Sequence, residues 1–161
     1  MLEQTQVFLK QEGWRYDLTS PNELEKVLHG AALYASVTVI EELLEYPVDP
    51  NHRDGLGQTV LQAVCGYCSN SNREQQSHYA KVVTLLLKYG AGLHDGVVFP
   101  AKQDHIGKNA LWLAVFSNAM PIVEGLLAAG AKDDCGALVK AVEHDSLDLI
   151  TRLTSRAEFS F

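Results

Sequence analysis

The sequence predicts an all-α solenoid of about four helix-turn-helix repeats with atypical N- and C-terminal caps. One pattern occurs four times in the 161 residues: a short apolar run with a pair of small residues, then a second run rich in Leu and Val. Two of the copies end in Gly-Ala, at Gly90-Ala91 and Gly130-Ala131. Units that repeat in this way are typical of solenoids, in which each unit stacks on its neighbours and the stack presents a surface.

The copy over residues 107–131 shows the expected elements most clearly. Apolar residues recur at i, i+3 and i+4 in both of its runs, which is the spacing of one helix face. These residues are Leu111, Ala114 and Val115, then Ile122, Val123, Leu126 and Leu127. Pro121 fits the first turn of the second helix, where its missing N–H is not needed. Gly130 fits the C-cap, which favours a residue with positive φ. We therefore expect a helix, a tight turn, a second helix and a cap in each copy.

The two ends of the chain depart from the repeat. Residues 1–22 precede the first copy, and we expect a short helix there whose apolar side chains cover the open core of repeat 1. These side chains are Val7, Phe8, Leu9, Trp14 and Tyr16. Ser20-Pro21 marks the start of the next helix. At the other end, Asp133-Asp134 runs almost directly into the last helix pair, as suits a cap, and Phe159-Ser160-Phe161 is expected to pack on the last repeat.

These features resemble the ankyrin repeat over about residues 24–156. The family pattern opens with Asp-x-x-Gly-x-Thr-Pro-Leu-His and closes with Gly-Ala. The chain matches the opening twice, at Asp54, Gly57, Thr59 and Leu61, and again at Asp104, Gly107 and Leu111. Since no single motif is complete, the common register of the four copies carries the resemblance. The chain resembles the small, degenerate ankyrin-repeat proteins of bacteria.

The departures from the family pattern fall at particular places. The histidine of Thr-Pro-Leu-His survives only as His29, which the resemblance implies is buried and stabilises its turn. The equivalent residues are Gln62, Trp112 and Val139. About ten extra residues lie between the helices of the second repeat, where the polar stretch 69–77 predicts a mobile loop or an extended helix turn. The connecting finger over 92–107 is some seven residues longer than the family's usual length.

We predict one domain over residues 1–161. Its parts are an N-terminal cap segment (1–22), repeat 1 (23–54), repeat 2 with the insertion and the long finger (55–102), repeat 3 (103–134) and a C-terminal capping repeat (135–161).

The charge is acidic and unevenly distributed. The net charge is −7. Residues 1–51 hold nine acids and three bases, whereas residues 52–161 hold eleven acids and ten bases. An acidic chain without a basic stripe argues against nucleic acid as the main partner. The acids Glu41, Glu42, Glu45 and Asp49 are interpreted either as a solvated outer face or as an acidic end that steers a basic partner protein.

Composition and targeting signals favour the cytoplasm. The N-terminus lacks the basic and apolar regions of a secretory signal, and no apolar stretch approaches the length needed to span a bilayer. Three cysteines, an odd number, do not form a disulfide framework and fit a reducing compartment.

The sequence gives little support for chemistry. Cys65 and Cys68 have the spacing of a redox dithiol, but no strand precedes them, and Cys65 occupies a small-residue position of the repeat where a buried side chain is expected. His78 and Cys135 are further metal ligands only by composition. The six histidines are scattered, and the motifs of nucleophilic or phosphate chemistry are missing. We therefore predict no enzyme activity, no cofactor, no metal and no small-molecule substrate.

The resemblance implies a binding surface on the concave face, formed by the finger tips and the first helix of each pair. The predicted contact residues on the helices are Tyr34, Tyr67, Phe116 and His144. Those on the fingers are Leu56, Gln58, Val98, Phe99, His105, Ile106 and Lys108. The aromatic residues either form an exposed stripe across neighbouring repeats, as interface centres prefer, or bury themselves against adjacent helices. The apolar run 97–100 is either folded back on the stack or presented to a partner.

The function expected from this surface is non-catalytic protein–protein binding. Some bacterial proteins of this kind act as immunity or inhibitory partners of a toxin or enzyme, and that is the narrower hypothesis. An alternative is an adaptor or secreted effector that recruits a host protein. A remote alternative is a thiol redox or metal-binding protein that uses Cys65 and Cys68.

Overall fold

The computed structural model describes residues 2–68, 72–96, 107–133 and 136–157. Within these ranges the backbone forms nine helices and one isolated antiparallel β-bridge, between Arg53 and Thr59. The helices are α1 (Glu3–Glu12), α2 (Pro21–Leu33), α3 (Val37–Leu44), α4 (Val60–Tyr67), α5 (Arg73–Lys88), α6 (Ala110–Phe116), α7 (Met120–Ala128), α8 (Ala137–Glu143) and α9 (Leu147–Ala157).

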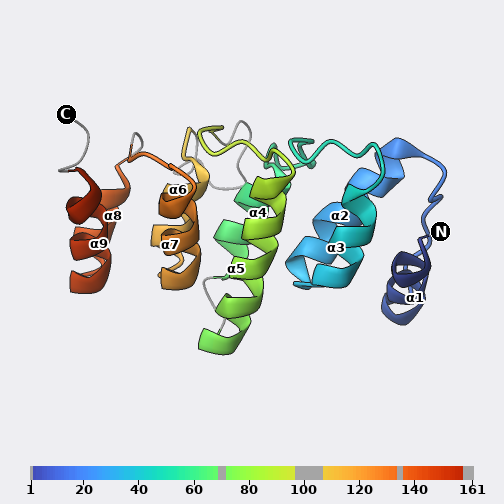
Figure 1. The fold of residues 1–161 in the computed structure, drawn as a ribbon, viewed down its shortest axis with the longest axis horizontal. Helices are drawn as coiled ribbons and strands as arrows, with labels where there is room; N and C mark the ends of the chain where they lie inside the picture. Colours follow the sequence, from blue (N-terminus) through green and yellow to red (C-terminus); the bar gives the residue numbers. More distant parts are fainter. Residues whose placement is uncertain (1, 69–71, 97–106, 134–135, 158–161) are drawn as a thin grey trace.

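The helices stand side by side in two layers (Figure 1). The first helices of the pairs, α2, α4, α6 and α8, form the inner layer, and α3, α5, α7 and α9 form the outer layer in front of it. Neighbouring pairs stack through α2 on α4, α4 on α6 and α6 on α8, and through α3 on α5 and α5 on α7. α1 lies beyond the first pair, against α3. The predicted fold class, an all-α repeat solenoid, is confirmed.

Local sequence signals fix where the helices begin and end. The Thr59 hydroxyl accepts from Gln62 N–H while the Gln62 side chain accepts from Thr59 N–H, a capping box that begins α4. Asn109 begins α6 by accepting from Trp112 N–H. Pro121 lies in the first turn of α7 as predicted, and Gly130 follows that helix with φ 94°. Because these signals are local, the sequence pattern located the helix pairs correctly.

One continuous apolar core runs through the stack. It extends from Phe8 on α1 to Leu153 on α9, and Leu28, Leu86 and Leu126 are among its completely buried side chains. Full burial of such a side chain stabilises the fold by about 1.5–3 kcal/mol relative to exposure. The inner helices are therefore held as a rigid platform rather than as independent hairpins.

Hydrogen bonds tie the first finger to the second. The Asn51 amide donates to Gly90 O at 3.1 Å and accepts from Gly92 N–H at 2.7 Å. The Arg53 guanidinium donates to Gly57 O at 2.8 Å and to Gly96 O at 3.2 Å. These bonds satisfy backbone groups that no helix pairs, and they fix the spacing of the fingers.

His29 has the role that the resemblance implied. Its ring is buried, and Nε2 lies 3.2 Å from His52 O in the following finger. Burial lowers the pKa of His29, so the ring is neutral at pH 7. His52 itself is half-buried, and its Nδ1 lies 2.8 Å from the Glu25 carboxylate.

The N-terminal cap is fastened by Glu42 of α3. No side chain of α1 itself caps its N-terminus. Instead the Glu42 carboxylate accepts from Thr5 N–H at 2.7 Å, from the Thr5 hydroxyl at 2.6 Å and from Gln4 N–H at 3.3 Å. An acid at this position also complements the positive end of the helix dipole. The Glu42 carboxylate, interpreted from sequence as part of a solvated or steering acidic face, therefore also has a structural role, because it accepts hydrogen bonds from the first turn of α1.

An aromatic cluster fills the space between α1 and the first repeat. Trp14 packs edge-on against Phe8, Tyr34 and Tyr16, with ring centroids 5.6–6.1 Å apart. Gly30 on α2 makes this possible, since a Cβ there would lie 2.3 Å from Cζ3 of the Trp14 ring. The predicted capping role of the N-terminal segment is confirmed for Phe8, Leu9, Trp14 and Tyr16, whereas Val7 is exposed.

The insertion of repeat 2 lengthens a helix. Asn72 caps α5 through a capping box with Gln75, and α5 has 16 residues where α7 has nine. Its first turns extend past the other helices on the side away from the fingers (Figure 1). Of the two alternatives for residues 69–77, the structure shows the extended helix turn over 72–77, and 69–71 lie outside the described residues. The predicted packing of Phe159-Ser160-Phe161 also lies outside them.

Replacing Glu42 should release α1 in a pH-dependent way. Burial alone raises the pKa of Glu42, but hydrogen bonds from Thr5 and the first backbone amides of α1 outweigh it and hold the pKa below the ordinary 4.5. A carboxyl with a depressed pKa stabilises the fold above its unfolded pKa, and this contribution is lost as pH falls through the folded value. We expect Glu42→Ala to cost about 1–2 kcal/mol at pH 7, measured by denaturant unfolding, and less below pH 4. Glu41→Ala, at an exposed neighbour on the same helix, is the control, and an equal loss there would contradict the assignment.

Two helical glycines should respond oppositely to alanine. Gly30→Ala drives a methyl group into Trp14 and is expected to cost about 1–3 kcal/mol with a change in tryptophan fluorescence. Gly66→Ala on α4 meets its nearest atom, Leu113 Cδ2, at 3.9 Å, so it should stabilise by up to about 1 kcal/mol through helix propensity. Thermal unfolding of both variants tests this, and a stabilising Gly30→Ala would show that Trp14 does not pack as described.

Candidate protein-binding face

The predicted helix residues occupy equivalent places in the four repeats. Tyr34 directly follows α2, Tyr67 ends α4, Phe116 ends α6 and His144 directly follows α8. We call these four residues the inner row. Tyr34 and Tyr67 are 55% and 59% exposed, His144 is exposed, and Phe116 is half-buried. The alternative that these rings bury themselves is therefore wrong for the two tyrosines and half correct for Phe116.

The tyrosines of the inner row are exposed but supported. The Tyr34 ring packs edge-on against Phe8 at 5.8 Å and Trp14 at 5.7 Å. A hydrogen bond with the Glu12 carboxylate raises the pKa of the Tyr34 hydroxyl. Tyr67 packs edge-on against Tyr79, whose hydroxyl donates to a backbone oxygen of α2 at 2.7 Å. Both rings thus lie on well-packed neighbours, with their remaining surface open.

The C-terminal half of the inner row is an aromatic and cationic cluster. Phe116 stacks on Trp112 with centroids 5.4 Å apart and an interplanar angle of 11°, and His144 approaches Phe116 at 6.1 Å. The Lys140 ammonium lies 5.2 Å from the Phe116 centroid, and that of Lys108 lies 5.1 Å from the Trp112 centroid. A cation over an aromatic face stabilises by about 0.5–1 kcal/mol when exposed and more when desolvated. These contacts restrict Phe116 to one orientation.

Glu143 completes this cluster. Its carboxylate pairs with Lys140 at 2.9 Å, and the hydrogen bond from that ammonium lowers the pKa of Glu143. Sequence reasoning missed that Lys140 and the buried Trp112 support Phe116 on this candidate face. The signal was present, because Trp112 stands where the family has histidine, a larger ring at an inner-helix position.

The predicted finger residues are only partly described. Leu56 is 48% exposed at the tip of a finger. The Asp54 carboxylate holds that tip by accepting from Leu56 N–H at 2.9 Å and from Gln58 N–H at 3.0 Å. Gln58 and Lys108 are half-buried. The remaining predicted contacts, Val98, Phe99, His105 and Ile106, lie outside the described residues.

The cysteine pair lacks the setting of a redox site. Cys65 and Cys68 are free thiols and completely buried. Burial raises the pKa of Cys68 to about 11 and that of Cys65 well above its usual value. Since the thiolate is the reactive form, both are poor nucleophiles at pH 7. His78 is exposed, Cys135 lies outside the described residues, and the described residues hold no cluster of three potential metal ligands.

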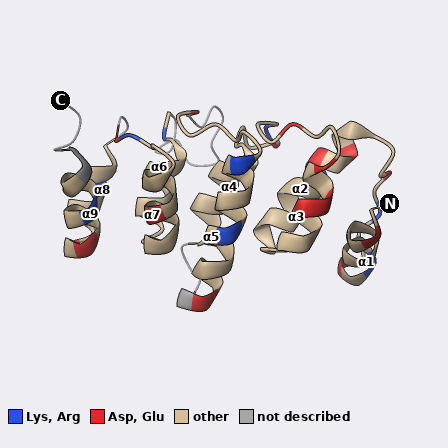
Figure 2. Cartoon of the chain, viewed as in Figure 1, with Lys and Arg blue, Asp and Glu red and all other residues tan. Residues whose placement is uncertain are grey.

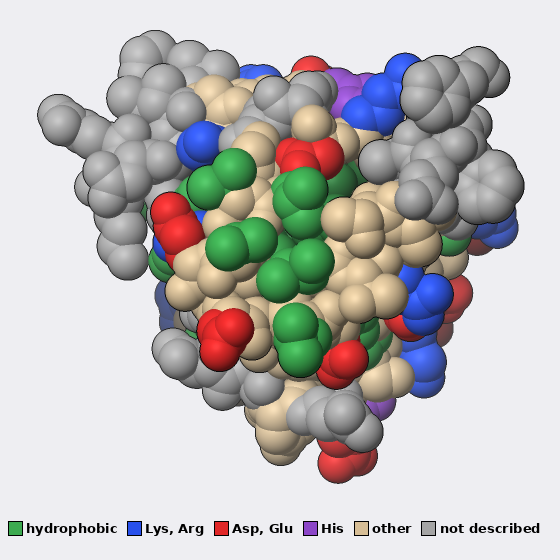
Figure 3. All heavy atoms as spheres, turned by 90° about the vertical axis from the view of Figure 1, so that its left-hand side faces the viewer, with side chains coloured by type: hydrophobic (Ala, Val, Ile, Leu, Met, Phe, Trp, Pro, Cys, Tyr) green, Lys and Arg blue, Asp and Glu red, His purple; other side chains and the backbone are tan. Residues whose placement is uncertain are grey.

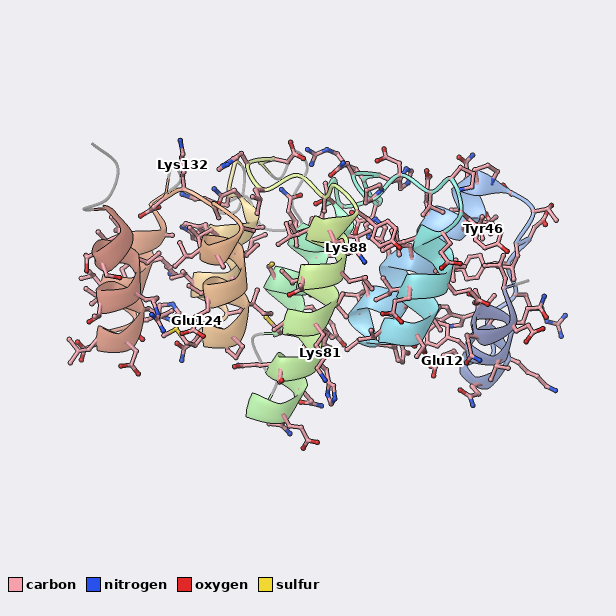
Figure 4. All side chains as sticks on the ribbon, viewed as in Figure 1. Glu12, Tyr46, Lys81, Lys88, Glu124 and Lys132 are labelled. Atoms are coloured by element: carbon pink, nitrogen blue, oxygen red, sulfur yellow. The ribbon has the colours of Figure 1, made fainter. Side chains whose placement is uncertain are left out.

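Acidic and basic residues are unevenly distributed along the stack. Figure 2 shows acidic residues concentrated on the N-terminal helices, with basic residues on α5. Figure 4 shows Lys81 and Lys88 along α5 and Glu124 on α7, all in the outer layer. Glu124 pairs with Arg152 of α9. Among the first-half acids, Glu41 on α3 and Glu45 directly after it are exposed, whereas Glu42 accepts hydrogen bonds from α1.

The stacked helix pairs, tied by fingers, define a repeat solenoid of the kind that presents a platform. A family model for ankyrin repeats, described as three copies, matches residues 28–135, and the chain belongs to the ankyrin repeat family. The fold is similar to the crystal structure of the human ASB11 ankyrin repeat domain, with a TM-score of 0.63 and 20% sequence identity. That match covers 80% of this chain and 53% of the other, so this chain spans about half the length of that domain.

Within the described part of the chain, the helices are all too short or too polar to cross a membrane.

Proposed function

We propose that this protein binds a partner protein through the inner row and the neighbouring finger tips, without catalysis. Ankyrin repeats are generally protein–protein interaction modules. The observation that carries the proposal is the alignment of exposed Tyr34 and Tyr67 with the Trp112–Phe116 stack on successive inner helices. Aromatic side chains on a rigid support are enriched at the energetic centres of interfaces.

The platform is set before a partner arrives. Binding normally costs about 0.5–1.5 kcal/mol for each flexible side chain that becomes ordered. Here Phe116 is held by Trp112 and Lys140, and Tyr67 rests on Tyr79, so much of this ordering is already complete. A preformed surface of this kind favours tight, stoichiometric binding over transient contact.

The narrower proposal is an immunity or inhibitory role against a toxin or enzyme. A rigid surface can block a target by covering it, so no chemistry of its own is required. The charge of residues 1–51, nine acids against three bases, favours approach of a basic target. The exposed Glu41 on α3 and Glu45 directly after it are proposed to contribute to this field, whereas Glu42 is engaged by hydrogen bonds from α1. We propose that the interaction takes place in the cytoplasm, a reducing compartment that suits the buried thiols of Cys65 and Cys68.

The test compares two exposed tyrosines on opposite layers. Tyr67→Ala removes the centre of the inner row, whereas Tyr89→Ala removes a 39% exposed ring that follows α5 in the outer layer. We expect affinity capture from a lysate of the source organism to recover one protein with the wild type and with Tyr89→Ala. Tyr67→Ala should weaken its binding at least about tenfold, equivalent to about 1.4 kcal/mol. Circular dichroism confirms that both variants remain folded.

Equal capture by both variants would contradict the proposed face. If the captured protein is an enzyme or toxin, adding one equivalent of this protein should abolish its activity in vitro. Unchanged activity at saturating binding would contradict the inhibitory role and favour the adaptor alternative.

A further inference from the structure

Tyr79 of α5 sets the distance between the first two members of the inner row. Its hydroxyl donates to Leu33 O at 2.7 Å, and Leu33 ends α2 directly before Tyr34. Its ring packs edge-on against Tyr67, with centroids 6.4 Å apart. Since Tyr79 is itself buried, it holds the exposed Tyr34 and Tyr67 at a fixed separation.

Ser117 sets the next distance along the row. It directly follows Phe116, and its buried hydroxyl donates to Cys65 O at 2.8 Å and lies 3.3 Å from Gly66 O. Those two carbonyl groups belong to the last turn of α4, which ends at Tyr67. The separation of Tyr67 from Phe116 is therefore also set by the fold rather than by a partner.

These separations match the repeat of a helical ligand. α2 packs on α4 and α4 on α6, and the axes of packed helices are about 8–10 Å apart. In an α-helix, side chains seven residues apart lie on nearly the same side and about 10.5 Å apart along the axis. A polyproline helix repeats about every 9.3 Å and fits the distance as well. An extended strand covers it in about three residues, but residues three apart point to opposite faces.

The two ends of the row differ in charge. At the first end, the Glu12 carboxylate forms a hydrogen bond with the Tyr34 hydroxyl. At the other end, the ammonium groups of Lys108 and Lys140 lie over the rings of Trp112 and Phe116, within 5.1–5.9 Å of the centroids. A ligand that lies along the row therefore has a carboxylate beside one end and ammonium groups beside the other.

Glu143 only partly offsets the positive charge of the second end. Its carboxylate pairs with Lys140 at 2.9 Å, and this ammonium, followed by His144 and Lys108, lowers the pKa of Glu143. Among these described side chains, two ammonium groups thus face one carboxylate. The His144 ring is exposed beside them and adds charge when it is protonated.

We propose that the contact segment of the partner is an amphipathic α-helix that lies along the inner row, with its N-terminal end at Tyr34 and its C-terminal end at Phe116. This inference rests on the proposed function and names the kind of segment that the same face binds. An α-helix is partially positive at its N-terminus and negative at its C-terminus, so this orientation places each end beside opposite charge. A polyproline helix has no internal hydrogen bonds and lacks such a dipole, so the charges favour the α-helix.

The length of the row limits the length of the helix. From Tyr34 to His144 the row crosses three helix spacings, about 24–30 Å in all. An α-helix of about 16–20 residues spans that distance. Figure 3 shows the C-terminal end of the stack beyond α8, where hydrophobic side chains gather at the centre and acidic side chains lie towards the edges. A helix that continued past α8 would bring its negative end towards these acids.

The experiment selects binders to the whole chain from two displayed libraries of peptides about 20 residues long. One library is built on a helical alanine-rich scaffold, and the other is unstructured and allows proline. We expect the helical library to give binders with apolar residues seven positions apart. Tyr67→Ala should weaken the selected peptides at least about tenfold, and the outer-layer control Tyr89→Ala should leave them unchanged.

The orientation is tested with the best helical peptide. A nitroxide label at its C-terminus should broaden the NMR signals of His144, and a label at its N-terminus should broaden those of Tyr34. Lys140→Gln should weaken binding by about two- to fivefold, the usual effect of a charge at a helix end. Lys88→Gln is the matched control, because Lys88 also lies over an aromatic ring, 5.7 Å from the Tyr89 centroid, but belongs to the outer layer.

Several results would overturn the proposal. They are binders that come only from the unstructured library, helical binders that tolerate Tyr67→Ala, a reversed pattern of label broadening, and a helical library that gives no binder. Proline at every third position of the selected peptides would identify a polyproline ligand instead. The proposed function survives each of these results as long as capture from the lysate depends on Tyr67, and it fails separately if that dependence is absent.

Discussion

Each helix pair of this protein can bury its apolar edge only against another helix pair, and the rest of the structure depends on that constraint. Leu28, Leu86 and Leu126 come from different pairs, yet they belong to one continuous core. The fingers add a second set of bonds, through Asn51 and Arg53, that keeps successive pairs in register. A platform held in both ways can present side chains such as Tyr67 in fixed positions without help from a partner.

The two ends of the stack meet the same constraint differently. At the N-terminal end, α1 supplies the missing neighbour, and Glu42 fastens it by accepting hydrogen bonds from the first amides of that helix. The Trp14 ring then fills the remaining space against Gly30. At the C-terminal end the last helix pair keeps the apolar outer side of an internal repeat, at Val139 and Val142. Within the described residues, the two ends of the stack therefore differ in how much apolar side-chain surface they expose.

Much of the fold could be predicted from the sequence, because its signals are local or repeat at a fixed spacing. The apolar periodicity of α6 and α7, Pro121 in a first turn and Gly130 after a helix follow from elementary backbone chemistry. The role of Glu42 could not be predicted, since its partner Thr5 is 37 residues away and the residue stands among other acids. The sequence left two alternatives for residues 69–77, a mobile loop or an extended helix turn. It could not decide between them, because polar residues that form helices well also occur in loops.

The candidate binding face could likewise be predicted only in part. The resemblance to the family placed Tyr34, Tyr67 and Phe116 on one surface, because it fixed their positions in the repeat. It could not show that Lys140 lies over Phe116, since that contact joins two repeats and depends on side-chain conformation. It also could not show whether Tyr34 is exposed or buried, because that depends on how much of its ring the N-terminal segment covers.

The central claim, that stacking between neighbouring helix pairs holds the structure together, is tested most directly by native-state hydrogen exchange on the dilute protein. The account predicts the slowest exchange in α4–α7, which have helix pairs on both sides, and strong protection of α1 despite its terminal position. It predicts the fastest helical exchange in α9, which packs mainly on α8 and pairs with α7 through Arg152 and Glu124. Equal protection across all repeats, or slower exchange in α9 than in α5, would contradict it.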